Sequence, residues 1–136
     1  MTSSCLFDST TLLLGGERMG TALLRGWIAS GIPTAAIEVI DPSPTPELLS
    51  IQRQHRITVN GDPCLRPKAE VIVLAVKPQI AAFAVESIRF RIQPKSLILS
   101  IMVGKTIVDL RMLFRTRVRL FAQCQTWLPL WDEACR

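Results

Sequence analysis

Residues 11–20 read Thr-Leu-Leu-Leu-Gly-Gly-Glu-Arg-Met-Gly, and this stretch decides the fold. A short apolar run that stops abruptly at two glycines predicts a buried strand over Thr11–Leu14. Apolar residues then recur at helical spacing from Met19 to Ser30, and Gly31 supplies a stop. A strand, a glycine-rich turn and a helix in this order predict the opening βα unit of a parallel sheet.

The rest of the chain alternates between strand-like and helix-like segments. Strands are predicted over residues 37–40, 57–59, 71–76, 97–102 and 118–121, and helices over residues 47–54, 80–90 and 106–114. This alternation predicts right-handed crossovers and an α/β fold, a Rossmann-like doubly wound parallel sheet in a single domain. Ligands of such sheets bind beyond the carboxyl ends of the strands, which directs attention to the loops after Leu14, Ile40 and Val76.

The first loop matches a dinucleotide-binding fingerprint at two of its three glycine positions. In that fingerprint the first glycine makes a tight turn, the second lets the backbone approach the pyrophosphate, and the third lets helix and strand pack closely. Gly15 and Gly20 occupy the first and third positions, whereas Glu17 occupies the second. A carboxylate there obstructs and repels a phosphate, so we expect a weakened pyrophosphate site. The alternative is that the glycines only make a tight turn.

Two further loops carry polar candidates. Asp41 ends the second predicted strand and is placed to accept hydrogen bonds from an adenosine ribose, although Asp41-Pro42 is also compatible with a simple turn. Ser43 is close enough in sequence to accommodate a 2′-phosphate, which leaves the choice between NADH and NADPH open. Lys77 follows the third buried strand, and a lone lysine at such a place is more typical of a solvated cap.

Composition excludes several other classes. The chain has 136 residues, 49% of them hydrophobic and 20% charged, which suits one globular domain. Its apolar runs are shorter than the roughly 18 residues of a membrane span, and its first residues lack signal-peptide features, so we expect a cytoplasmic protein. Four scattered cysteines and a single histidine, His55, lack the spacing of metal ligands. We therefore expect no metal and no membrane.

The net charge of +5 comes largely from four arginines between residues 111 and 119. A solvated arginine face is the ordinary explanation, and the aromatic platform of single-strand binders is missing. We expect no nucleic-acid partner. A basic nucleic-acid binder is kept as a third hypothesis, which predicts steeply salt-dependent DNA binding.

Taken together, the loop motifs resemble the pyrroline-5-carboxylate reductase family. The resemblance extends from about Leu12 to Val118. It is carried, in order, by residues 12–27 around the glycine loop, by Asp41-Pro42-Ser43-Pro44, and by Val73-Leu74-Ala75-Val76-Lys77-Pro78-Gln79. Residues 100–104, Ser-Ile-Met-Val-Gly, are similar to the Ser-Ile-Ala-Ala-Gly segment of the family, with both alanines replaced.

This resemblance implies a reductase of proline biosynthesis, which passes hydride from NADPH or NADH to the C=N bond of 1-pyrroline-5-carboxylate. It implies an N-terminal nucleotide-binding domain and a C-terminal helical domain that dimerises and completes the substrate pocket. No catalytic residue is carried over. The implied cofactor-binding residues are Gly15, Gly16, Met19 and Gly20 at the pyrophosphate, Asp41 and Ser43 at the adenosine ribose, and Ala75, Val76, Lys77 and Pro78 near the other half of the nucleotide.

The resemblance ends close to the C-terminus. We predict an NAD(P)-binding domain over residues 1–119 and a tail outside the family pattern over residues 120–136. The helical domain is expected to be missing, and the isolated chain to be inactive. DNA that encodes residues 121–136 can read Arg-Ala-Met-Pro-Asn in a neighbouring frame, which is similar to the family's continuation. We hypothesise a frameshift, which the nucleotide sequence tests.

Two hypotheses from different classes follow. In the first, the chain is the cofactor-binding part of an oxidoreductase and is inactive alone. In the second, it is a free-standing nucleotide-binding or regulatory module that pairs with a full-length homologue. Co-purification with such a homologue would distinguish the second from the first.

Overall fold

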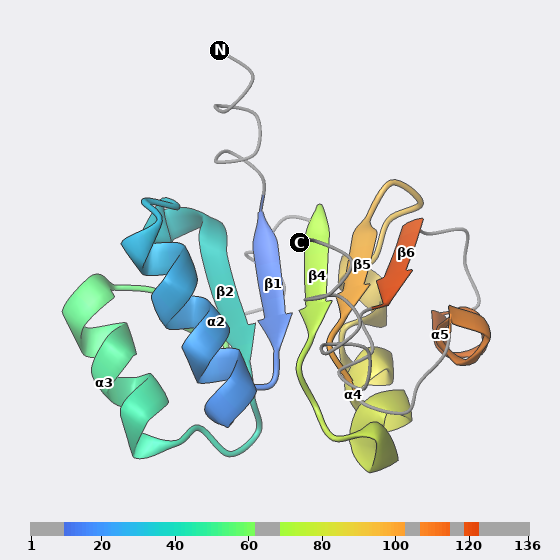
Figure 1. Cartoon of the computed structure of the whole chain (residues 1–136), viewed down its shortest axis with the longest axis horizontal. Coiled ribbons are helices and arrows are strands. Elements are labelled where there is room, and N and C mark those ends of the chain that lie inside the picture. Colours follow the sequence, from blue (N-terminus) through green and yellow to red (C-terminus); the bar gives the residue numbers. More distant parts are fainter. Residues whose placement is uncertain (1–9, 62–68, 103–106, 115–118, 123–136) are drawn as a thin grey trace, which may run out of the picture.

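The computed structural model describes residues 10–61, 69–102, 107–114 and 119–122. Within them lies one parallel sheet of six strands in the order β3-β2-β1-β4-β5-β6 (Figure 1). This is the strand order of the doubly wound dinucleotide-binding fold, so the predicted fold class is confirmed. The strands are β1 (Thr11–Leu14), β2 (Ile37–Ile40), β3 (Thr58–Val59), β4 (Val71–Leu74), β5 (Leu97–Ser100) and β6 (Arg119–Ala122).

Within the described ranges, four α-helices connect these strands, in the places that the periodicity predicts. They are α2 (Arg18–Ala29), α3 (Pro46–His55), α4 (Ala81–Ser87) and α5 (Ile107–Phe114), with 3₁₀ turns η1 (Thr34–Ala36), η3 (Pro78–Ile80) and η4 (Arg89–Arg91). The single helix predicted over residues 80–90 is divided, because the N–H groups of Ile88 and Arg91 bond three residues back instead of four. No helix in the described ranges is long and apolar enough to cross a bilayer.

Two strands end earlier than the sequence predicts. The strand predicted over residues 71–76 ends at Leu74, and the one predicted over residues 97–102 ends at Ser100. At the carboxyl end of β5, the N–H of Met102 donates to the hydroxyl oxygen of Ser100 at 3.2 Å, which turns the chain out of the sheet. Alanine, valine and methionine continue the apolar runs past these points, so hydropathy alone does not show where pairing stops.

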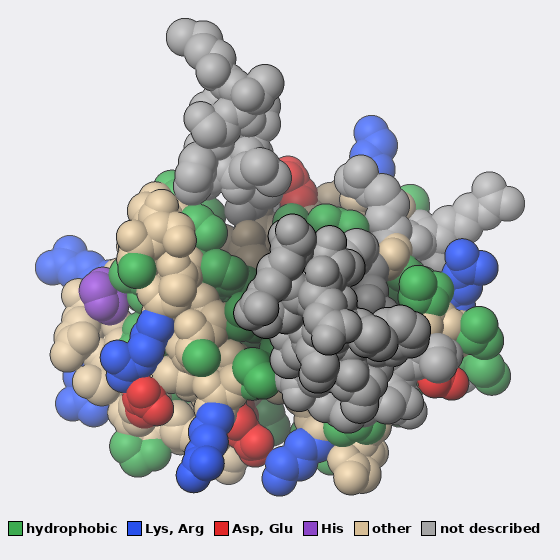
Figure 2. All heavy atoms as spheres, viewed as in Figure 1, with side chains coloured by type: hydrophobic (Ala, Val, Ile, Leu, Met, Phe, Trp, Pro, Cys, Tyr) green, Lys and Arg blue, Asp and Glu red, His purple; other side chains and the backbone are tan. Residues whose placement is uncertain are grey.

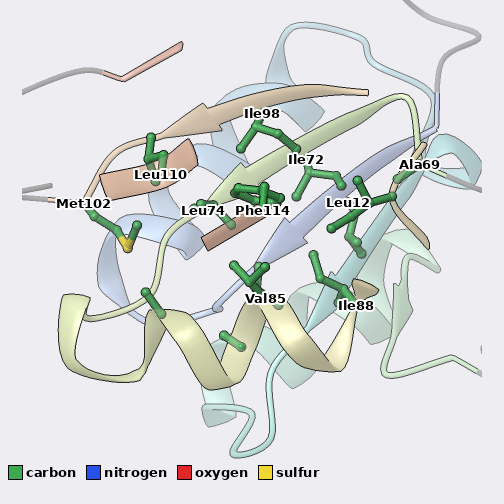
Figure 3. Packing of buried hydrophobic residues seen from close by; sticks show 14 residues of the cluster. Leu12, Ala69, Ile72, Leu74, Val85, Ile88, Ile98, Met102, Leu110 and Phe114 are labelled. Atoms are coloured by element: carbon green, nitrogen blue, oxygen red, sulfur yellow. The ribbon is translucent and has the colours of Figure 1, made fainter. Parts of the chain in front are cut away.

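The sheet is buried on both faces. Figure 1 shows α2 in front of β1 and β2 with α3 beside it at the left, and α4 behind β4 and β5. Residues alternate between the two faces, because successive side chains of a strand point in opposite directions. Leu13, Val39 and Val73 pack against α2 and α3. Leu12, Ile72, Leu74 and Ile98 meet Val85 of α4, Ile88 just after it, and Leu110 and Phe114 of α5 (Figure 3).

One ion pair lies inside this core. The guanidinium of Arg91 donates to the carboxylate of Glu38 at 2.8 Å, and both side chains are 2% exposed. The pair joins β2 to the segment before β5, which is 53 residues away in sequence. The second carboxylate oxygen of Glu38 is buried without a hydrogen-bond partner in the described part of the chain.

Candidate dinucleotide-binding site

The glycine loop begins in a conformation that requires glycine. Gly15 has φ +99°, in the left-handed region that side chains disfavour. A Cβ atom on Gly15 would lie 2.6 Å from the carbonyl oxygen of Ala75 and 2.9 Å from Cγ1 of Val76. The N–H of Gly15 donates to the carbonyl of Ile40 at 2.9 Å. The loop therefore lies tightly between the carboxyl ends of β2 and β4.

Gly20 brings the first turn of α2 against the start of the loop. A Cβ atom on Gly20 would overlap the carbonyl oxygen of Gly15, so any side chain there would push helix and loop apart. Thr21 fixes the same turn, because its hydroxyl donates to the carbonyl of Gly16 at 2.8 Å. Gly15 and Gly20 thus have the tight-turn and close-packing roles that the fingerprint assigns to its first and third glycines.

Glu17 occupies the N-cap position of α2, in extended conformation. Its side chain is exposed and makes no capping hydrogen bond. It lines the groove described below, at the N-terminus of a twelve-residue helix whose dipole favours anions. The backbone of this helix end is suited to a phosphate, whereas the Glu17 carboxylate is not.

Asp41 connects the second loop to the first. Its side chain is 7% exposed; Oδ2 accepts from the N–H of Gly16 and Oδ1 from the N–H of Ser43, both at 2.9 Å. The carboxylate is therefore a fixed negative charge beside the glycine loop. The sequence places Asp41 at the correct strand end, but it gives no sign of the hydrogen bond to Gly16.

Asn60 holds the backbone of Asp41 in place. The side-chain oxygen of Asn60 accepts from the N–H of Asp41 at 2.9 Å, and its amide group donates to the carbonyl of Asp41 at 2.7 Å. Asn60 itself has φ +52°, a conformation that asparagine tolerates better than most residues. The strand predicted over residues 57–59 ends just before Asn60, and nothing in the sequence indicated this role for it.

A groove of about 540 Å³ opens at the carboxyl edge of the sheet. Figure 2 shows charged side chains of both signs along the lower edge of the molecule, where the strand arrows of Figure 1 point. α3 also begins here, with the Thr45 hydroxyl accepting from the N–H of Leu48 at 3.2 Å. The groove is lined by Glu17, Arg18, Met19, Thr45, Ala75, Val76, Lys77 and Pro78.

The structure places the ten predicted cofactor residues at one edge of the sheet, in three groups. Five line the groove, namely Met19, Ala75, Val76, Lys77 and Pro78. Three form the buried backbone of the loop, namely Gly15, Gly16 and Gly20. Asp41 and Ser43 are linked to that loop through the carboxylate but do not line the groove. Arg18 and Thr45 were not predicted; the Thr-Pro-Glu start of α3 was the available signal for Thr45.

Comparison with known proteins decides the family. A family described as NADP oxidoreductase, coenzyme F420-dependent, matches residues 11–104, which include all ten predicted site residues. The chain belongs to this family. Its domain is accordingly a Rossmann-type domain of the dinucleotide-binding oxidoreductases.

Its relatives with curated functions include pyrroline-5-carboxylate reductases. It is 32% identical over 105 residues to pyrroline-5-carboxylate reductase 1 of Bacillus subtilis, covering 74% of this chain and 35% of that protein. It is 30% identical over 96 residues to the pyrroline-5-carboxylate reductase of Methanosarcina acetivorans, covering 67% and 34%. The resemblance inferred from the loop motifs is thus confirmed, and the chain spans about a third of the length of these relatives.

A solved pyrroline-5-carboxylate reductase from Coxiella burnetii has the same fold. It superposes with a TM-score of 0.72 at 24% identity, over 84% of this chain and 43% of that one. The family member described here therefore corresponds to the N-terminal part of the longer relatives. The predicted boundary at residues 119/120 falls inside β6 (Arg119–Ala122) and stays a prediction, and residues 123–136 of the predicted tail lie outside the described residues.

Proposed function

We propose that this chain is the cofactor-binding part of a pyrroline-5-carboxylate reductase-like oxidoreductase, and that NADH or NADPH binds in the groove at the carboxyl edge of the sheet. The observation that supports this most strongly is the packing of Gly15 and Gly20. Both positions exclude a Cβ atom, and together they bring the N-terminus of α2 to the edge of the sheet. A pyrophosphate would accept hydrogen bonds from this helix end.

Glu17 fits the cofactor less well than the glycines do. In a largely solvated groove, a carboxylate within about 6 Å of a doubly charged pyrophosphate disfavours binding by on the order of 1–3 kcal/mol, which is about tenfold to a hundredfold in affinity. The positive charges of Arg18 and Lys77, which line the same groove, oppose part of this repulsion. We therefore expect binding that is weak but measurable.

The proposal includes a preference for NADH over NADPH. The Asp41 carboxylate is held by two backbone N–H groups and cannot swing away without losing them. It can accept hydrogen bonds from the ribose hydroxyls of NADH, whereas the 2′-phosphate of NADPH adds negative charge beside it. The exposed hydroxyl of Ser43 is the available donor to such a phosphate, but it does not neutralise the charge.

Within this proposal, the reduction of 1-pyrroline-5-carboxylate to proline requires a protein as long as the relatives and is not assigned to the isolated chain. When bound, the cofactor supplies hydride for the C=N bond, and the protein supplies position and electrostatics. We expect no imine reduction by the isolated chain, because it spans only about a third of the length of the relatives named for that reaction. Turnover above background with the purified chain would contradict this. A cytoplasmic location is part of the same proposal.

Calorimetric titration of the purified chain with NADH and NADPH tests the cofactor site. Two variants accompany the parent chain: Glu17→Gly removes charge and bulk, and Glu17→Gln removes charge alone. We expect Glu17→Gly to bind NADH roughly tenfold to a hundredfold more tightly than the parent, with Glu17→Gln in between. If none of the three proteins gives a heat of binding, the proposed site is refuted.

The alternative is a free-standing nucleotide-binding or regulatory module without catalysis. It shares the groove and differs in its partner, since it would act on a full-length homologue. Co-expression of the chain with such a homologue, followed by affinity purification, separates the two. Stable co-purification would favour the module, and its absence would favour the oxidoreductase part.

A further inference from the structure

Large exposed apolar side chains are concentrated on one side of the described structure. Seven such residues are exposed, and only Met19 belongs to the cofactor groove. The other six belong to α4, α5 and the turns around α4. We call them the α4–α5 face; they are Ile80, Phe83, Phe90, Ile107, Val108 and Met112.

The most exposed of these residues point away from the sheet. Val85 of α4 and Ile88 at its C-cap face inward (Figure 3), and Phe83 lies on the opposite side of the helix with 76% of its surface exposed. In α5, Leu110 and Phe114 face inward, so the outward stripe falls on the remaining positions. Val108 is 66% exposed and Met112 is 72% exposed.

The two outward stripes lie on neighbouring helices. The inward residues of α4 and α5 belong to the same core cluster, so the helices pack side by side on the sheet. Arg89 also joins them, because its guanidinium donates to the carbonyls of Phe114 at 3.1 Å and Leu113 at 3.2 Å. This places the end of α4 beside the end of α5.

The apolar area of the face is what a stable interface needs. A fully exposed large side chain presents about 150 Å², near the lower end of the range for aromatic residues. With this value, the exposed fractions of the six residues of the face correspond to on the order of 500 Å² of exposed apolar surface. A standard interface buries about 800 Å² per partner, of which roughly 55–65% is apolar. The face therefore supplies the apolar part of one side of such an interface, near the upper limit of what single monomers leave exposed.

We propose that the α4–α5 face binds a second copy of this chain about a two-fold axis. The charges of these helices are compatible with this partner: Glu86 and Arg89 pair with each other at 2.8 Å, and α5 adds one acid and one base, Asp109 and Arg111, although the chain as a whole carries +5. Two copies meet there without net repulsion, and a two-fold axis lets one surface serve both partners. The face lies on helices behind the sheet, so the inference is independent of the cofactor groove.

Sedimentation equilibrium of the full chain from about 1 to 100 μM tests the proposal. We expect a species of twice 15.1 kDa that dissociates on dilution. Phe83→Glu and Met112→Glu should each raise the dissociation constant roughly 30-fold or more, as interface hot spots do. Ala22→Glu, at an exposed position of α2, is the matched control and should leave it unchanged. Circular dichroism reports whether each variant is folded.

A second measurement needs no variant. Hydrogen exchange of the parent chain should show slower exchange in α5 at high concentration than at low concentration, with α2 unaffected. A monomer at every concentration, species larger than a dimer, or a dimer that tolerates Met112→Glu would overturn the proposal. So would a monomer that associates only with an added full-length relative, because that result assigns the face to a different partner.

Discussion

The buried ion pair between Arg91 and Glu38 gives a prediction that can be worked out in magnitude. Both side chains are 2% exposed, and their charged atoms are 2.8 Å apart. Arg91→Ala leaves the Glu38 carboxylate buried without its cation, including the oxygen that lacks a partner in the described structure. Breaking such a pair costs about 3–5 kcal/mol, a large part of a typical stability of about 5–15 kcal/mol.

Replacing both charges should behave differently. The variant Glu38→Leu/Arg91→Met removes the pair and its desolvation cost together, and comparable replacements are neutral or stabilising by about 1–4 kcal/mol. The exposed pair Arg25–Glu47 is the matched control, since Arg25→Ala should cost under about 1 kcal/mol. The two ion pairs have similar N–O distances, 2.8 Å and 2.6 Å, and differ mainly in burial, so the comparison isolates the effect of burial on stability.

Urea unfolding followed by circular dichroism measures all four proteins. With an m-value of about 1–3 kcal/mol/M, Arg91→Ala should lower the midpoint by about 2 M, and the apolar double variant should not. A cost under about 1 kcal/mol for Arg91→Ala would show that the pair is not buried in solution. A double variant as unstable as Arg91→Ala would show that the pair itself stabilises the fold.

Three further outcomes follow from the site. Gly20→Ala should lower the free energy of unfolding in urea by about 1–3 kcal/mol and weaken NADH binding in calorimetry, because the new Cβ atom overlaps the carbonyl of Gly15. Gly26→Ala is the control: nothing lies within 4 Å of its new atom, and it should stabilise the fold by about 0.5–1 kcal/mol. Thr45→Ala removes the N-cap hydrogen bond of α3 and should lower the stability measured by thermal unfolding by about 1 kcal/mol, whereas Thr45→Ser keeps the capping hydroxyl and should keep the stability. Asp41→Asn should reduce the ratio of the NADPH dissociation constant to the NADH dissociation constant about tenfold. An unchanged ratio would show that Asp41 does not select the cofactor.

Short-range signals in the sequence determined much of the fold. Strands β1 and β2 have the bounds that the sequence predicts, because each is a brief, mainly apolar segment closed by a glycine pair or by Asp-Pro. The helices follow from 3.6-residue periodicity, and the ends of α2 and α3 shift by only one residue. The helix predicted over residues 80–90 differs more, since α4 ends at Ser87. The order of these elements then leaves few topologies for a parallel sheet, which is why the fold class followed from the sequence.

The glycine positions of the site could also be predicted from the sequence, because only glycine fits φ +99° at Gly15 and the close contact at Gly20. Other features depend on residues that are distant in sequence. The bond from Gly16 to the Asp41 carboxylate spans 25 residues, and the pair of Glu38 with Arg91 spans 53. Periodicity and motifs report only on neighbours along the chain, so these contacts, and the exposure of Phe83 and Met112, were decided when the helices packed on the sheet.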